Sequence, residues 1–120
     1  MGVKIRNLKN ETLKNISYRR VILTNKHLQL VLMTLQPGET IPLEIHKTLD
    51  QFIRVEHGVL NGKIEGKEFK LKNGEFVIVP AGERHVFWNN SSHKKSVHLF
   101  TLYSRPNHPS QRIQKRQPYK

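Results

Sequence analysis

The amino-acid sequence predicts an all-β protein, folded as a single sandwich or barrel. Short segments rich in Val, Ile, Leu and Phe recur along the chain, and residues that favour tight turns separate them. No segment shows a convincing 3.6-residue hydrophobic period over three turns, which argues against a helical protein. A chain of 120 residues suits one domain with a modest core.

The expected strands are short and closely spaced. We expect them at residues 17–24, 27–36, 51–59, 67–71, 76–79, 85–88 and 96–103. Pairs that suit turns lie between them, and Asn-Gly in particular favours the left-handed backbone of tight hairpins. We therefore expect turns at Asn25-Lys26, Pro37-Gly38, Asn61-Gly62, Glu65-Gly66, Asn73-Gly74 and Ala81-Gly82.

The character of the sequence changes after Ser104. Residues 105–120 contain three prolines, five Lys or Arg residues and a single aliphatic residue, Ile113. Such a segment buries little surface, so we expect it either to be disordered or to lie along the barrel or a partner. The sequence thus predicts a β domain over residues 1–104 and a basic tail over residues 105–120, with the boundary near Tyr103 to Pro109.

The formal net charge of +12 is the most unusual bulk property, with 21 Lys or Arg residues against nine Asp or Glu. A charge of this size attracts nucleic acid and other polyanions at long range. No nucleic-acid-binding signature accompanies it, so we favour a solvated basic surface over a nucleic-acid partner.

Three absences bear on the class of protein. No apolar run approaches the length of a membrane-spanning helix, and the N-terminus lacks the apolar stretch of a signal peptide. The chain has no cysteine, which excludes a disulfide framework and a thiolate metal site. We therefore expect a cytoplasmic protein with no membrane segment.

Two stretches, residues 37–58 and 74–89, stand apart from the strand background. In the second, Gly74, Pro80, Gly82, His85 and Asn89 are separated by five, one, two and three residues. The first places Gly38, Glu44, His46, Gln51 and Gly58 at intervals of five, one, four and six residues. Together they resemble the two conserved motifs of the cupin superfamily, and the resemblance covers roughly residues 30–103.

This resemblance implies a jelly-roll barrel, a double-stranded β-helix, with a metal ion in its lumen. The positions that carry ligands in the family are Glu44, His46, Gln51 and His85. The sequence departs from the usual pattern at two of them, because Glu44 stands where His is usual and Gln51 stands where Glu is usual. The ligand set therefore still contains one carboxylate, at position 44 instead of position 51.

Two imidazoles, one carboxylate and one amide form a mixed nitrogen and oxygen ligand set. Such a set suits a divalent transition metal, namely Mn, Fe, Co, Ni, Cu or Zn. An amide is a weak ligand, so a cupin that keeps the fold and has lost firm metal binding is the alternative interpretation.

Asp50 is an alternative to Gln51, because the family tolerates a spacing that is one residue shorter. Strand alternation favours Gln51, which shares a face with Ile53 and Val55, the apolar set expected inside a barrel. Asp50 shares the other face with Phe52, which we expect to be the outer one.

The same alternation predicts that Phe87 and Asn89 point inward with His85, while Val86 and Trp88 point outward. For the last long strand either face can be the inner one. One face holds Val97, Leu99, Thr101 and Tyr103, and the other holds His98, Phe100 and Leu102.

For several residues outside the motifs we expect structural or surface roles. His27, His57, His93, His98 and His108 are interpreted as surface or loop residues, and Arg54 and Arg84 as solvated charges. Exposed apolar residues often mark interfaces. Since cupins commonly dimerise through a sheet face, we interpret Trp88 and Phe100 as candidates for a homodimer interface.

A metal with open coordination positions supports Lewis-acid and oxygen chemistry. The resemblance therefore implies a metal-dependent enzyme, an oxygenase, isomerase or lyase, that acts on a small polar molecule, although the fold hosts many chemistries. No separate catalytic acid or base is identified from the sequence. A non-enzymatic cupin that binds or senses a small ligand is the alternative, and polyanion binding is a less favoured third.

Overall fold

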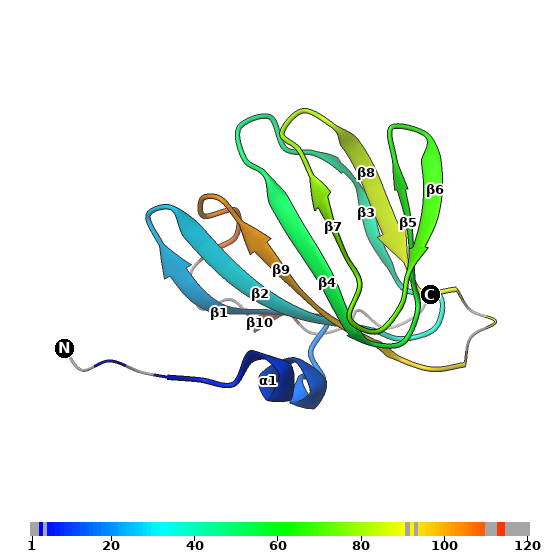
Figure 1. Ribbon diagram of the computed structural model, residues 1–120, viewed down its shortest axis with the longest axis horizontal. Coiled ribbons are helices and arrows are strands. Elements are labelled where there is room, and N and C mark those ends of the chain that lie inside the picture. The colour runs from blue at the N-terminus through cyan, green and yellow to red at the C-terminus, as the bar shows by residue number, and fades with distance from the viewer. Residues whose placement is uncertain (1–2, 4, 91, 93, 110–112, 115–120) are drawn as a thin grey trace.

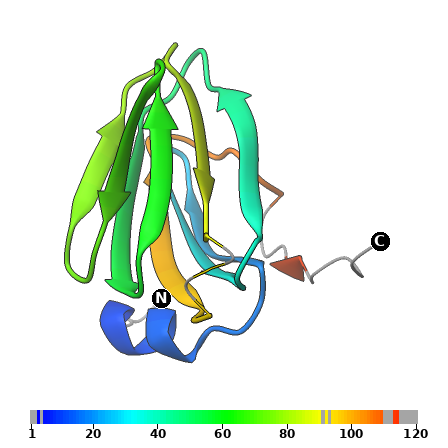
Figure 2. The same ribbon diagram turned by 90° about the vertical axis from the view of Figure 1, so that its right-hand side faces the viewer.

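The computed structural model describes residues 3, 5–90, 92, 94–109 and 113–114. Two antiparallel sheets face each other, one six-stranded in the order β10-β1-β2-β9-β4-β7 and one four-stranded in the order β3-β8-β5-β6 (Figures 1 and 2). This is an all-β jelly-roll fold, as the sequence predicts. The elements are α1 (Leu8–Lys14), β1 (Arg19–Asn25), β2 (Leu28–Leu35), β3 (Thr40–Ile45), β4 (Gln51–His57), β5 (Leu60–Ile64), β6 (Lys67–Leu71), β7 (Phe76–Val79), β8 (Arg84–Trp88), β9 (Val97–Tyr103) and β10 (Ile113–Gln114).

The apolar core lies between the two sheets and follows the alternation of the strands. In β4 the side chains of Gln51, Ile53 and Val55 are buried, while Asp50 just before the strand is exposed. In β8 and the residue after it, Phe87 and Asn89 are fully buried, as expected. These inward positions are therefore confirmed.

Strand β9 has two buried faces, which explains why its sequence is ambiguous. Leu99 and Tyr103 belong to the core between the sheets. Phe100 is only 5% exposed but points to the outer side of the six-stranded sheet, where its ring lies 6.1 Å from that of Phe52. Helix α1 packs against β2, β4 and β9 on this side (Figure 1).

Helix α1 was not expected, because its seven residues are too short to show a helical period over three turns. Local capping defines it instead. The Asn7 side chain accepts a hydrogen bond from the Asn10 N–H at 2.9 Å, as an N-cap residue does. Among the described residues no helix has the length and hydropathy of a membrane-spanning segment.

The predicted turn at Asn61-Gly62 is wrong, because both residues lie inside strand β5. Gly62 is needed there for packing: a Cβ atom at this position would lie 2.6 Å from the Phe69 ring and 2.9 Å from the Phe87 ring. The chain turns earlier, at Gly58, whose φ of +99° suits glycine.

Strands β3 and β10 were also missed. Strand β3 contains Pro42, which an edge strand tolerates because one side of it has no hydrogen-bonding neighbour. Strand β10 is only two residues long and pairs with β1, the Cα of Gln114 opposite that of Arg19. Pro42 interrupts the strand pattern of the first segment, and the second is too short to show a pattern.

The described part of the tail lies along the barrel. Gln29 is fully buried, and its Oε1 accepts hydrogen bonds from the N–H groups of Asn107 and His108, both at 2.9 Å. Its Nε2 donates to the His108 carbonyl at 2.8 Å and to Thr24 Oγ1 at 3.0 Å. One buried amide therefore ties residues 107–108 to β2. The domain boundary at residue 104 stays a prediction.

The histidines outside the motifs differ in their surroundings. His27 and His57 are exposed, as expected. His98 and His108 are half-buried, and the His108 ring packs edge-on against Tyr103 at 5.5 Å, so these two are not simple surface residues. His93 lies outside the described residues.

Candidate metal centre

Three of the four predicted ligands come together at one end of the space between the sheets. One ligand atom from each of Glu44, His46 and His85 lies within 4.8 Å of the other two. Glu44 and His85 are paired across the ladder between β3 and β8, and His46 follows directly after β3. The cluster joins the two sequence motifs in a single site, although His46 and His85 are 39 residues apart in the sequence.

A β-bulge in β3 aims Glu44 at this site. Ile41 pairs with Phe87, yet Glu44 rather than Leu43 pairs with His85, so the register shifts by one residue between them. Such a shift turns the following side chains to the opposite face. As a result Leu43 is 60% exposed, and Glu44 stands on the same side as His85.

His85 is oriented by its own strand. Its side chain is buried, and Nδ1 lies 3.0 Å from the carbonyl oxygen of Glu83. A carbonyl oxygen only accepts, so Nδ1 carries a proton, and the nitrogen left to bind a metal is Nε2. A carbonyl partner on the second nitrogen is the usual arrangement for a histidine that binds a metal.

His46 is held through its backbone, whose carbonyl accepts a hydrogen bond from the Gly82 N–H at 2.8 Å. Its Nε2 lies 3.2 Å from Glu44 Oε2, and its ring centre lies 5.0 Å from that of His85. Burial lowers the pKa of His46, Glu44 raises it, and His85 lowers it, with a net decrease. A neutral imidazole is the form that binds a metal.

The spacing of these atoms fits a divalent transition metal. Zinc, for example, binds histidine nitrogen at about 2.0–2.1 Å in tetrahedral geometry, so two of its ligand atoms are about 3.3–3.4 Å apart. The 3.2 Å between His46 Nε2 and Glu44 Oε2 is close to this separation. Imidazole and carboxylate are also ligands that such metals accept.

Gln51, the fourth predicted ligand, is 3% exposed. Its Nε2 donates to Thr101 Oγ1 at 3.0 Å and is 3.3 Å from the Tyr103 hydroxyl, which orients the amide. Its Oε1 is buried and has no hydrogen-bond partner among the described residues. A buried acceptor without a partner is unfavourable, and a metal ion would satisfy it.

Asp50, the alternative to Gln51, faces away from the cluster. It is exposed, and its Oδ1 accepts a hydrogen bond from the Ala81 N–H at 2.8 Å. The Asp50 carboxylate thus supports the loop before β8. The assignment of Glu44, His46, Gln51 and His85 as metal ligands remains a prediction.

Tyr103 is a site residue that the sequence reasoning did not identify. Its ring lies edge-on to His46 at 5.8 Å. Its pKa is raised to about 12, chiefly by burial, while the positive charge of Arg19 lowers the pKa and the negative charge of Glu44 raises it. The phenol is therefore neutral at physiological pH. The only signal was its position on the same face as Thr101, one of the two faces left open for this strand.

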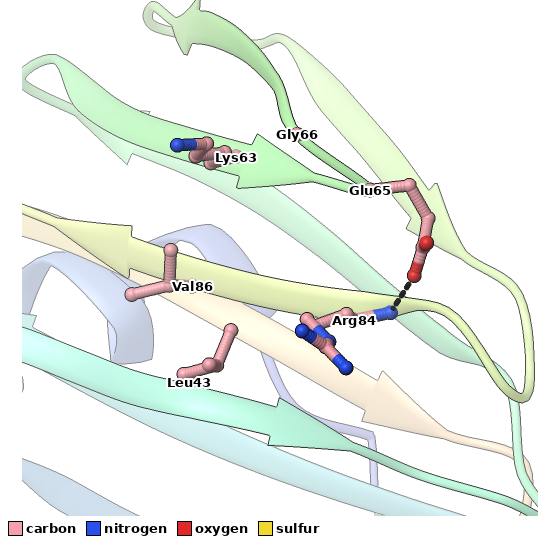
Figure 3. A pocket seen from close by; sticks show the side chains of 6 residues that line it. All are labelled: Leu43, Lys63, Glu65, Gly66, Arg84 and Val86. Carbon is pink, nitrogen blue, oxygen red and sulfur yellow. Dashed lines mark hydrogen bonds between the residues drawn. The ribbon is translucent and has the colours of Figure 1, made fainter.

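A separate hollow of about 460 Å³ lies on the outer face of the four-stranded sheet (Figure 3). Arg84 and Val86 line it; they flank His85 in β8, and alternation turns them to the opposite face. The Glu65 carboxylate accepts a hydrogen bond from the Arg84 backbone N–H (Figure 3). The Arg84 side chain is exposed, as expected, whereas Arg54 is half-buried and lies 3.3 Å from a Glu56 carboxylate oxygen.

Comparison with known proteins establishes the family. The model of the cupin domain matches residues 31–103, so this chain belongs to the cupin family. It is similar over 97% of its length, at 44% identity, to the uncharacterised protein L612 of Acanthamoeba polyphaga mimivirus, of which it spans 74%.

Two further similarities concern the fold and the chemistry. The crystal structure of BH2720 from Bacillus halodurans superposes with a TM-score of 0.89 and 32% identity, over 93% of this chain and 88% of that chain. A 74-residue segment, 62% of this chain, is 28% identical to quercetin 2,3-dioxygenase of Bacillus subtilis, of which it covers 22%.

Proposed function

We propose that this cupin holds a divalent transition metal on Glu44, His46, Gln51 and His85 and acts as a metal-dependent enzyme on a small molecule. The observation that carries the proposal is the convergence of Glu44, His46 and His85 within 4.8 Å. The carbonyl that fixes the His85 tautomer and the unpartnered Oε1 of Gln51 support it. An oxygenase is the first activity to test, because a relative of part of the chain is a dioxygenase.

A bound metal of this kind supplies Lewis-acid activation and, if it is redox-active, oxygen chemistry. The chain itself supplies the surroundings. The neutral Tyr103 hydroxyl lies 3.3 Å from Gln51 Nε2 and 3.4 Å from His108 Nε2, so it has polar neighbours on two sides. Residues 107–108 are tied to β2 through Gln29, and the His108 ring packs against Tyr103.

The metal site is tested by elemental analysis of purified protein. We expect the wild type to retain a transition metal and a His46→Ala, His85→Ala double variant to lose it. A His27→Ala, His57→Ala double variant is the matched control, because both of its histidines are exposed and neither belongs to the cluster. Equal metal content in all three proteins would eliminate the site.

Enzymatic activity is tested separately from metal binding. The metal-loaded protein is screened for oxygen consumption, isomerisation and elimination with small polar substrates, with the same double variant as the negative control. Ligand-dependent thermal stabilisation without turnover would favour a binding or sensor cupin over an enzyme.

A further inference from the structure

One buried arginine of β1 has no carboxylate partner among the described residues. Arg19 in β1 is only 7% exposed, and it alternates with exposed Arg20 so that it shares the inner side of the strand with Val21. Every Asp and Glu of the chain is among the described residues, and none of them forms an ion pair with Arg19. A charge buried without a counter-charge is unfavourable, so this position needs an explanation.

The contacts of Arg19 with the described residues leave the Nε atom of its guanidinium without a partner. Nη1 donates to Gln114 Oε1 at 2.7 Å, and the group lies over the Tyr18 ring at 5.4 Å. Nε is buried and has no hydrogen-bond partner among the described residues. Nε and Nη2 form the side of the guanidinium that matches the two oxygens of a carboxylate, and no described residue forms a hydrogen bond or an ion pair with this side.

Arg19 belongs to the surroundings of the metal centre. Tyr18, its neighbour in the sequence, donates a hydrogen bond to the Thr40 carbonyl of β3, the strand that carries Glu44. The pKa of Tyr103 is raised chiefly by burial, and the charges of Arg19 and Glu44 shift it in opposite directions. The Tyr103 ring in turn contacts His46. The guanidinium and the ligand cluster thus act on the same buried phenol.

We propose that Arg19 binds the carboxylate of a small molecule whose other end reaches the metal centre. This inference rests on the proposed function and adds the substrate class, a carboxylic acid. Gln114 acts as a positioning residue, because it occupies Nη1 and leaves the Nε and Nη2 edge for the ligand. The net charge of +12 increases the local concentration of such anions.

The inference is tested on the full chain, freed of metal by chelation, so that its outcome does not depend on the metal centre. Acetate and malonate are titrated in 150 mM NaCl, and the Arg19 Nε–H signal is followed by ¹⁵N NMR. We expect a saturable shift of this signal. A charge-assisted bidentate contact corresponds to a roughly tenfold or greater loss of affinity in Arg19→Met, with a smaller loss in Arg19→Lys.

Arg20→Met is the matched control, because Arg20 precedes Val21 in the same strand and points outward. Unchanged affinity in Arg19→Met, or an equal loss in Arg20→Met, would overturn the inference. If inorganic phosphate binds as tightly as malonate with the same dependence on Arg19, the carboxylate assignment is wrong. If Arg19→Met does not fold, an Nε–H signal of the wild type that carboxylates leave unmoved is the refuting result. Equal metal content in the wild type and the His46→Ala, His85→Ala variant, with carboxylate binding intact, would refute only the proposed function.

Discussion

Replacement of Gln51 by methionine tests whether this residue is a metal ligand or only supports the structure through its amide. Methionine has a similar length but no hydrogen-bonding amide. The exchange removes the contacts of Nε2 with Thr101 and Tyr103, each of which contributes about 1 kcal/mol. It also removes the buried, unpartnered Oε1, which costs about 1–3 kcal/mol. In the metal-free protein these effects nearly cancel, so we expect the free energy of unfolding to change by no more than about 1 kcal/mol.

In the presence of metal, Gln51→Met should lower the free energy of unfolding. At a free metal concentration of 100 times the wild-type Kd, binding stabilises the wild type by about 2.7 kcal/mol. Outer-shell partners alone affect metal affinity by about 10- to 100-fold, so loss of a ligand should weaken binding at least about tenfold. At the same metal concentration a tenfold weaker variant gains only about 1.4 kcal/mol. The metal-dependent increment should therefore fall by about 1.3 kcal/mol or more.

The assay is urea unfolding with and without Mn²⁺ or Zn²⁺, whichever the wild type binds. Gln29→Met is the matched control, because Gln29 is also a buried glutamine but all of its hydrogen-bonding groups have protein partners. We expect this variant to lose stability equally in both conditions. An unchanged metal increment in Gln51→Met would refute the assignment of Gln51 as a ligand.

Further predictions concern pH, packing and assembly. The pKa of His46 is below its unfolded value, so the folded state disfavours protonation and the metal-free protein should lose stability as pH falls from about 6.5 through the folded pKa. Urea unfolding between pH 5 and 7 should show this loss in the wild type but not in His46→Gln, and equal slopes would contradict it. Gly62→Ala should destabilise the fold by about 1–3 kcal/mol, because its Cβ would overlap the Phe69 ring, and thermal melting that shows no decrease would oppose this reasoning. We also expect a homodimer formed through the outer face of the six-stranded sheet, where Phe76 and Ile78 are 55% and 54% exposed. Light scattering should give a dimer mass for the wild type and a monomer mass for Phe76→Asp, and a monomeric wild type would exclude this interface.

The sequence suggested Trp88 and Phe100 as dimer contacts, whereas the structure points to Phe76 and Ile78. Trp88 is half-buried on the four-stranded sheet, and Phe100 is almost fully buried on the other sheet, so the two cannot belong to one patch. Strand alternation can predict which side chains point outward, but it could not predict which of them another part of the chain would cover. Phe100 lies against Phe52, and α1 packs on the same strands, a contact between segments far apart in the sequence.

The sequence by itself determined the class of fold, the two motifs and the residue types proposed as ligands, because these depend on local spacing and on a strand period of two residues. Tertiary structure alone decided the rest. The bulge that turns Glu44 inward depends on its register with β8. Gly62 lies in a strand because aromatic rings from other strands fill the space above it. Tyr103 contacts His46 only through sheet order and the closure of one sheet over the other. Pairing between distant strands sets these features, and a local pattern does not encode which strands become neighbours.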